Sequence, residues 1–410
     1  MELLLLHPSL RRDCVDSPVP AALGLLQPGP RAGPAHATIR CQVTLRVGSG
    51  WNWRYIFELI EGAVADEKRE PLKSKDNKGL NSEQSCGKKK VPGSNEKELT
   101  SEKLGAICPR TLPEAPLQRV VPASESLTEE LSQAMLRMNM GLEREYAYDI
   151  FSSMMKQQSY AFQAFDLPRS ITPEMRALVI DWLVQVHDYF CLSDETLYLT
   201  VYLMNAYMKA GKVRILSLQL LGIACLFVAC KVEDSTCPEV NQLCFMTQDS
   251  FTWKELLRME RKILTRLKFE LHYANPLHLL HWVAEVAQST LEVQYLARYF
   301  LELSLMEVDC VRFEPAQLAL AALHLAQRLL LQEGGTKEMP QEGSCKLHTY
   351  SESELSAVYP YMAKAALRGP NSPLCATFLK YSRPQKLCIS TSFDITASES
   401  LNRCLGSPIP

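Results

Sequence analysis

The chain has 410 residues and a formal net charge of −2, with 44 basic and 46 acidic side chains. This length suffices for two or three domains that each bury a core of their own. The near balance of charge provides no cationic excess for holding nucleic acid or an anionic membrane surface, so we expect neither as a partner.

Residues 1–126 are predicted to form a disordered N-terminal tail. The stretch QPGPRAGPAHA at 27–37 is rich in Pro, Gly and Ala, and residues 66–103 are mainly polar. Such a composition buries too little apolar surface to offset the entropy lost on ordering. The aromatic stretch WNWRYIFELIEGAVA at 51–65 is an exception that could form a short helix, and we assign it no function.

The opening MELLLL is not typical of a secretory signal, because it lacks a basic region and His7 and Pro8 soon follow. The 14 cysteines show no paired framework. Four of them lie among apolar residues: Cys225, Cys230, Cys237 and Cys244. Reduced core thiols of an intracellular protein, in the nucleus or the cytoplasm, are favoured over a zinc site. Lys88-Lys89-Lys90 could be a nuclear import signal, although a solvated charge run is the commoner explanation.

A lead-in at 127–172, with a helix up to about Gln158, precedes a strongly predicted helix at 173–189. Thr172 is a good N-cap, and Pro173 suits the first helical position. Apolar residues then follow helical spacing and cover most of the circumference: Met175, Ala177, Leu178, Val179, Ile180, Trp182, Leu183, Val184 and Val186. A helix of this kind is buried on all sides or presents one face to a partner.

Four further helices are predicted at 194–209, 216–230, 238–245 and 252–267. The stretch 216–230 is too short to span a bilayer and is predicted to be a core helix. Thr252 and Glu255 have the spacing of a capping box at the start of the last helix.

A second helical set is predicted at 276–287, 290–307, 315–331 and 352–367, with a loop at 334–348. Pro360 should kink the last helix. Residues 386–410 are predicted to be a disordered C-terminal tail. No useful strand alternation occurs, so the predicted fold class is all-α.

Four segments resemble the cyclin family in order and spacing. MRALVIDWLVQV at 175–186 resembles the helix that opens the cyclin box of A- and B-type cyclins. The other three are ETLYLTVYLMNAY (195–207), LQLLGIACLFVACKVED (218–234) and SFTWKELLRMERKILTRLKFEL (250–271). The resemblance, which spans about 145–385, implies two tandem five-helix cyclin-fold bundles, at 173–272 and, more divergent, at 273–385. It also implies a regulatory subunit that binds and activates a cyclin-dependent kinase through the kinase αC helix, and not an enzyme.

The resemblance assigns kinase binding to two polar residues, Lys231 and Glu260, which match charged residues that hydrogen-bond the backbone beside αC. From the residues alone, a surface cation at a helix end and a solvated glutamate are the simpler interpretation. The surrounding apolar surface is predicted to contain Val228, Val232, Leu264, Phe269 and Leu271, although Val228 and Leu264 could equally be core. A-type and B-type cyclins have Phe where this chain has Val232, so kinase binding is expected to be weaker or differently selective.

A second surface implied by the resemblance is a hydrophobic patch that docks Arg-x-Leu peptides of substrates or inhibitors. Its predicted members are Met175, Leu178, Val179, Trp182, Gln185, Leu218 and Gln219. A-type cyclins carry a glutamate at the position of Gln185, where it pairs with the arginine of the peptide. We therefore expect a weaker preference for arginine in this chain.

Two further assignments follow from the resemblance. Arg176 should be paired with the next helix, where Asn205 replaces the usual aspartate and leaves the arginine charge uncompensated. In the predicted tail, Arg69, Leu72 and Asn77 fit the pattern of a destruction box, a degron read by a ubiquitin ligase. So short a pattern also arises by chance.

No enzyme motif is found: the chain lacks a Gly-rich phosphate loop, a Gly-x-Ser-x-Gly elbow and a His-Glu-x-x-His motif. His278 and His281 are one turn apart but have no carboxylate or Cys at ligand spacing, so packing or surface roles are favoured over a metal site. We expect no cofactor. The alternative function is a divergent cyclin-fold adaptor that binds partners without activating a kinase, which the residues Val232, Asn205 and Gln185 favour.

Overall fold

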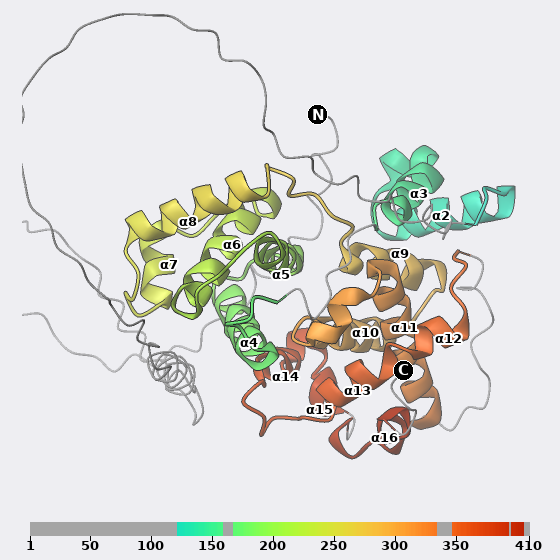
Figure 1. Cartoon of the computed structure of the whole chain (residues 1–410). Coiled ribbons are helices and arrows are strands. Elements are labelled where there is room, and N and C mark those ends of the chain that lie inside the picture. The colour runs from blue at the N-terminus through green and yellow to red at the C-terminus, as the bar shows by residue number, and fades with distance from the viewer. Residues whose placement is uncertain (1–120, 159–166, 334–346, 393–394, 406–410) are drawn as a thin grey trace, which may run out of the picture.

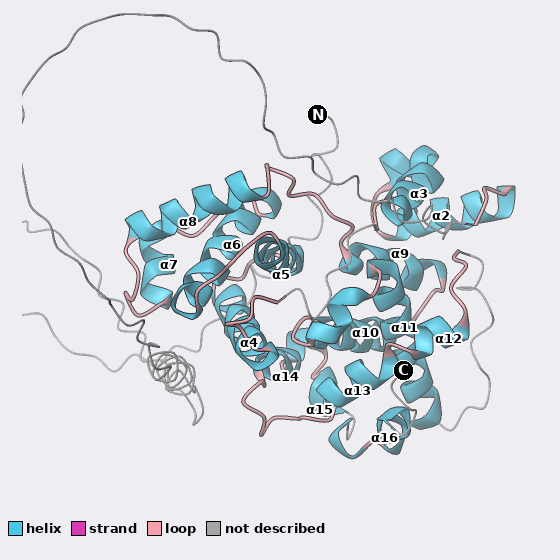
Figure 2. Cartoon of the chain, in the orientation of Figure 1, coloured by secondary structure: helices cyan, strands magenta, loops and turns pink. Residues whose placement is uncertain are grey.

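The computed structural model describes residues 121–158, 167–333, 347–392 and 395–405, and its regular elements there are helices (Figure 2). Two helices, α2 (Glu125–Arg137) and α3 (Ala147–Lys156), precede the first repeat. They pack on the second repeat, where α2 contacts α9 (Figure 1) and the rings of Phe151 and Trp282 lie 5.9 Å apart. Because α2 begins at Glu125, order in this region starts before residue 127.

The first repeat consists of five helices: α4 (Pro173–Tyr189), α5 (Asp194–Lys209), α6 (Leu218–Glu233), α7 (Val240–Met246) and α8 (Trp253–Arg266). Their bounds agree with the sequence prediction to within a few residues. Two of the predicted caps are present: Thr172 accepts a hydrogen bond from the amide of Met175, and Thr252 and Glu255 form a reciprocal capping box.

Helix α6 is the core of this repeat, and every residue from Leu218 to Cys230 is buried. It packs on α4, α5 and α8. A Cβ atom at Gly222 would lie 3.1 Å from side-chain atoms of both Val179 and Leu183, so glycine permits α4 to approach closely. The stretch Ile215–Glu233 is long and apolar enough for a membrane span, but 78% of its window is buried inside the protein, as in a core helix.

The second repeat contains α9 (Pro276–Val286), α10 (Leu291–Ser304), α11 (Pro315–Glu333), α12 (Glu352–Ser356) and α13 (Tyr359–Ala366). The single helix predicted at 352–367 is thus divided in two. Pro360 lies in the first turn of α13, where a missing N–H is tolerated, so the chain breaks before it instead of bending around it.

The C-terminal segment differs from the sequence prediction. It forms α14 (Ala376–Tyr381), α15 (Ile389–Ser392) and α16 (Glu399–Leu405), although a disordered tail was expected from residue 386. Ile389, Ile395 and Leu401 are buried and anchor it. Their wide spacing gives no helical periodicity, which explains why the pattern did not reveal them. Helix α14 lies beside α4, so the start of the C-terminal segment packs on the first repeat, whereas α15 and α16 pack on α10 and α13 of the second repeat (Figure 1).

Candidate functional site

Lys231 and Glu260 are brought together at the surface of the first repeat. Lys231 lies in the last turn of α6 and Glu260 in the middle of α8, and their side chains form an ion pair. The lysine side chain is 43% exposed and its ammonium also lies 3.7 Å from the centre of the Phe227 ring, whereas the glutamate is 13% exposed. A partner backbone group can reach the lysine, but it must share Lys231 with Glu260.

The apolar residues predicted around this pair are exposed to very different degrees. Phe269 is 71% exposed and Val232 is 40% exposed, while Leu264 and Leu271 are half-buried. Val228 is only 3% exposed and belongs to the internal face of α6, so it is not available for surface contact as the prediction required.

The exposed ring of Phe269 is positioned by a left-handed turn. Lys268 and Phe269 both have positive φ, at 53° and 59°, and the amide of Phe269 donates to the carbonyl of Leu264 at 3.0 Å. A bulky residue adopts this conformation only at an energetic cost. The chain therefore holds a large apolar ring in solvent at the end of α8.

The predicted docking patch lies largely inside the protein. Four of its members are at most 7% exposed: Val179, Trp182, Leu218 and Gln219. Helices α4 and α6 pack against each other, and Val179 contacts Gly222 of α6 closely. Only its edge is partly accessible, at Met175, Leu178 and Gln185.

Gln185 is occupied by an internal contact that the sequence did not indicate. Its Nε2 atom donates to Oδ2 of Asp181 at 2.9 Å, and the amide of Ala376 donates to Oδ1 of the same carboxylate at 2.9 Å. Burial raises the pKa of Asp181 to about 6, against the effect of these two hydrogen bonds. A glutamate at position 185 would place a second carboxylate one helical turn from the first, which gives a physical reason for the amide.

Arg176 and Asn205 are also brought together, and both are buried. The Nε atom of Arg176 donates to Oδ1 of Asn205 at 2.9 Å, and Nη1 donates to the carbonyls of Leu305 (3.0 Å) and Met306 (3.2 Å) in the second repeat. Nη2 has no partner among the described residues. Burial lowers the pKa of Arg176 to about 10. The arginine thus bridges the two repeats with its charge only partly compensated.

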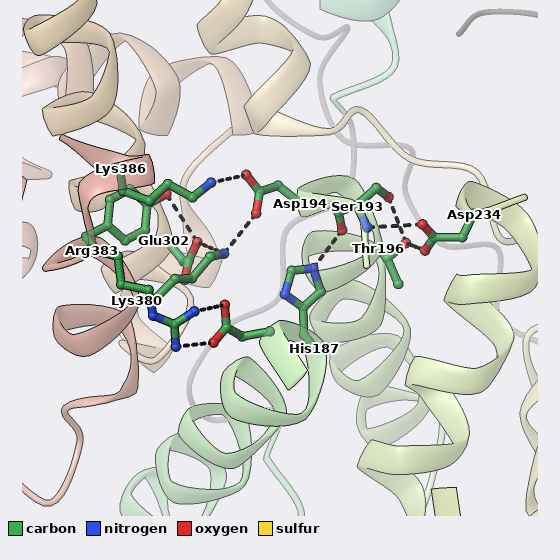
Figure 3. A network of polar contacts seen from close by, with 11 residues as sticks. His187, Ser193, Asp194, Thr196, Asp234, Glu302, Lys380, Arg383 and Lys386 are labelled. Atoms are coloured by element: carbon green, nitrogen blue, oxygen red, sulfur yellow. Dashed lines mark hydrogen bonds and ion pairs between the residues drawn. The ribbon is translucent and has the colours of Figure 1, made fainter. Parts of the chain in front are cut away.

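A buried polar network that sequence reasoning missed joins the C-terminal segment to the first repeat (Figure 3). Nζ of Lys380, on α14, lies 2.8 Å from Asp194 at the start of α5 and 2.7 Å from Glu302 on α10. Lys386 adds a contact of 3.1 Å to Asp194. Although burial alone would raise the pKa of Asp194, the two ammonium groups hold it well below its ordinary value. These residues are far apart in sequence, so no motif spacing connects them.

The same network continues into the α4–α5 connection. Nε2 of His187 lies 2.7 Å from the carbonyl of Ser193, and Asp234 accepts from the amide of Ser193 at 3.0 Å and from Thr196 at 2.5 Å. Burial lowers the pKa of His187. This histidine is therefore a structural group, and its buried ring is not accessible to a partner protein.

The remaining candidates yield no chemical site. In the described part of the chain, no group of three or more His, Cys, Asp or Glu side chains is placed to hold a metal ion. His281 is half-buried, and the desolvation of its ring lowers its pKa to about 3, while His278 lies 3.7 Å from Glu195. The degron residues Arg69, Leu72 and Asn77 and the Lys88–Lys90 run fall outside the described residues.

Comparison with known proteins identifies both repeats. Residues 147–272 match the N-terminal domain of cyclins, and residues 274–394 match their C-terminal domain. The second match extends past residue 385, where the sequence prediction ended that domain.

Curated relatives agree with these matches. A G2/mitotic-specific cyclin-B from Spisula solidissima is 33% identical over 299 residues, which cover 69% of each chain. The G2/mitotic-specific cyclin-B2 from Oryzias latipes is 34% identical over 60% of this chain and 63% of its own length, and the one from Bos taurus is 36% identical over 54% and 55%. The chain thus spans slightly less than two thirds of the Oryzias relative. On the two domain matches and the Spisula relative, the chain belongs to the cyclin family.

Proposed function

We propose that this chain is a regulatory subunit that binds and activates a cyclin-dependent serine/threonine kinase. The observation that carries the proposal is the surface of Lys231, Val232, Glu260 and Phe269, which we call the α6–α8 face. It combines a charged pair with an apolar ring held in solvent at 71% exposure. Large rings of this kind are common anchors of protein interfaces.

The mechanism would be conformational. The α6–α8 face packs on the αC helix of the kinase and stabilises the inward position of that helix, in which the Lys–Glu pair and the Mg²⁺-binding aspartate of the kinase align. The cyclin contributes no catalytic group. It shifts the kinase equilibrium through contacts that only the active state offers.

A double substitution, Lys231→Ala with Glu260→Ala, tests this role. We expect loss of kinase capture and of histone-substrate phosphorylation after co-expression with a cyclin-dependent kinase, at unchanged helicity. The matched control is Glu399→Ala with Arg403→Ala, which removes a surface ion pair of α16 with 3.2 Å between its charged atoms. Retained capture by the first variant, or equal loss in the control, would contradict the assignment.

The second candidate function is an adaptor that binds partners without activating a kinase. Two departures from the cyclin pattern favour it. Gln185 replaces a glutamate and donates to Asp181, and Asn205 replaces the usual aspartate as the partner of Arg176. Capture of a kinase that stays inactive toward histone would support this function over activation.

Two further partners and a location belong to the proposal. Arg-x-Leu peptides would dock at the accessible edge of α4, and a ubiquitin ligase would read the Arg69 motif. Neither nucleic acid nor a membrane is expected to bind. The protein would act in the nucleus, the cytoplasm or both.

A further inference from the structure

A groove on the first repeat, which we call the basic groove, is lined by cationic side chains and by no acidic one within the described residues. The six cations are Lys212, Arg214, Arg258, Arg261, Lys262 and Arg266. The groove has a volume of about 680 Å³ and lies between α8 and the segment that connects α5 to α6. It departs locally from the near balance of charge in the whole chain.

The cations on α8 form a stripe along one side of the helix. Residues 258, 261, 262, 265 and 266 all line the groove and follow the spacing of a single helical face. Lys212 and Arg214 come from the connecting segment, so two separate stretches of chain supply positive charge to the same groove.

These cations are available to a ligand. Five of the six are exposed, and none of the six takes part in an ion pair with any residue that the structure describes. The sixth, Arg266, is half-buried, and its guanidinium lies 3.9 Å from the centre of the Tyr207 ring. The two acids nearest in sequence are engaged elsewhere: Glu260 pairs with Lys231, and Glu255 accepts from the amide and hydroxyl of Thr252 in the capping box.

The arrangement favours an acidic peptide over nucleic acid. Single-stranded nucleic acid needs exposed aromatic rings for stacking, but the one aromatic side chain that lines the groove, Tyr207, is 5% exposed. Duplex-binding domains are strongly basic, whereas this chain has a pI near 6.5.

The spread of the charges matches a run of carboxylates. From 258 to 266 the stripe extends about 12 Å along α8, at 1.5 Å per residue. An extended peptide covers that length with about four residues, at roughly 3.3 Å each. We propose that the basic groove binds an acidic linear segment of a partner protein, whose carboxylates pair with arginines 258 and 261 and lysine 262.

The basic groove is separate from the α6–α8 face. Glu260 and Leu264 lie on one side of α8, and Arg258 and Lys262 are about half a helical turn away, at 100° per residue. The two surfaces can be occupied together, so the proposal is independent of kinase binding and can be tested without a kinase.

Isothermal titration calorimetry of the full chain with a peptide of about ten residues, alternating glutamate and glycine, tests the proposal at an ionic strength of about 50 mM. We expect measurable binding that weakens with salt, and at least tenfold weaker binding of the peptide with glutamine in place of glutamate. Equal binding of the glutamine peptide would overturn the proposal. So would tighter binding of a single-stranded oligonucleotide or an anionic phosphatidylserine vesicle of equal charge.

The triple variant Arg258→Gln, Arg261→Gln, Lys262→Gln should bind the glutamate peptide about tenfold more weakly than the parent does. The loss is modest because each exposed ion pair contributes little to the binding free energy. The matched control carries the same charge change at three exposed cations outside the groove: Arg144→Gln, Lys156→Gln and Lys364→Gln. The control should bind as the parent does. Equal weakening in both variants would show a nonspecific effect of net charge and overturn the proposal. Circular dichroism of both variants establishes that folding is retained.

Discussion

Nζ of Lys380 lies 2.7 Å from Oε2 of Glu302, and the two side chains are only 5% and 0% exposed. An ion pair this deeply buried couples the C-terminal segment to the second repeat, and the contact of Lys380 with Asp194 extends that coupling to the first repeat. The packing of the two repeats therefore depends on a lysine from α14, at the start of the C-terminal segment.

Lys380→Met should destabilise the protein by about 3–5 kcal/mol, because it leaves the buried carboxylate of Glu302 without its cation. Urea unfolding followed by circular dichroism measures the change. Replacing Glu302 as well, with leucine, should recover part of the loss, since it removes the uncompensated charge. A double variant less stable than Lys380→Met would argue against a charge effect.

Asp181→Asn should stabilise the protein at alkaline pH. The folded pKa of Asp181, about 6, lies above its ordinary value of 3.8. The protonated carboxyl group therefore contributes stability that is complete below pH 3.8 and is lost as the pH rises through 6. The substitution should therefore raise the free energy of unfolding by about 2–3 kcal/mol at about pH 8, and much less at about pH 4.

Melting temperatures at the two pH values check this dependence. The exposed Asp149, replaced by asparagine, is the control and should show no gain at alkaline pH. A gain for Asp181→Asn that is the same at both pH values would point to packing instead of titration.

Asn205→Asp should raise the melting temperature, since a carboxylate would compensate the buried charge of Arg176 at the position where Asn205 now accepts a hydrogen bond of 2.9 Å. We expect a gain of about 1.5–3 kcal/mol, the range for hydrogen bonds to charged groups. Calorimetry measures it, with the exposed Asn402→Asp as the control. A clear fall in melting temperature would mean that the added charge costs more to bury than it returns.

The arginine preference of the peptide-docking edge should be weak in the parent chain. Because Gln185 is neutral and donates to Asp181, Arg-x-Leu and Ala-x-Leu peptides should bind with similar affinity. Glutamate at position 185 should restore a preference for arginine, but only with Asp181→Asn, which removes the facing carboxylate. Fluorescence anisotropy compares the double variant with Asp181→Asn alone. Strong arginine discrimination by the parent would contradict this interpretation.

Phe269→Ala should weaken kinase binding about tenfold or more, as expected for an exposed aromatic anchor, while leaving stability nearly unchanged. Phe245→Ala is a matched control, because that ring is 68% exposed but lies on α7, whereas Phe269 is 71% exposed. Surface plasmon resonance with a purified cyclin-dependent kinase distinguishes them. Equal affinity of the two variants would exclude Phe269 as an anchor.

The helices of both repeats could be predicted from sequence because their signals are local. Thr172 and Thr252 mark starts that the structure also shows, and apolar periodicity sets the rest. The C-terminal helices could not be predicted, since α15 and α16 are short and are held by contacts to α10 and α13 rather than by their own pattern.

Only those contacts of the candidate site that lie within the cyclin-like segments could be predicted from sequence. The resemblance to cyclins implied the pairing of Arg176 with Asn205, but the carbonyls of Leu305 and Met306 that complete it lie about 130 residues away. Likewise, the spacing of Val179 and Trp182 is the same for an internal face and an exposed patch. Only the position of α6 decides between them, and it places both inside.

Because α14 contacts α4 and α5, a truncation of the C-terminal segment should disturb the N-terminal cyclin domain. A premature stop shortly after residue 370 would leave every codon of the N-terminal cyclin domain intact, yet would remove Ala376 from Asp181 and Lys380 from Asp194. The damage would appear some 190 positions upstream of the lesion. We therefore expect the two regions, which match separate cyclin domains, to unfold as one cooperative unit.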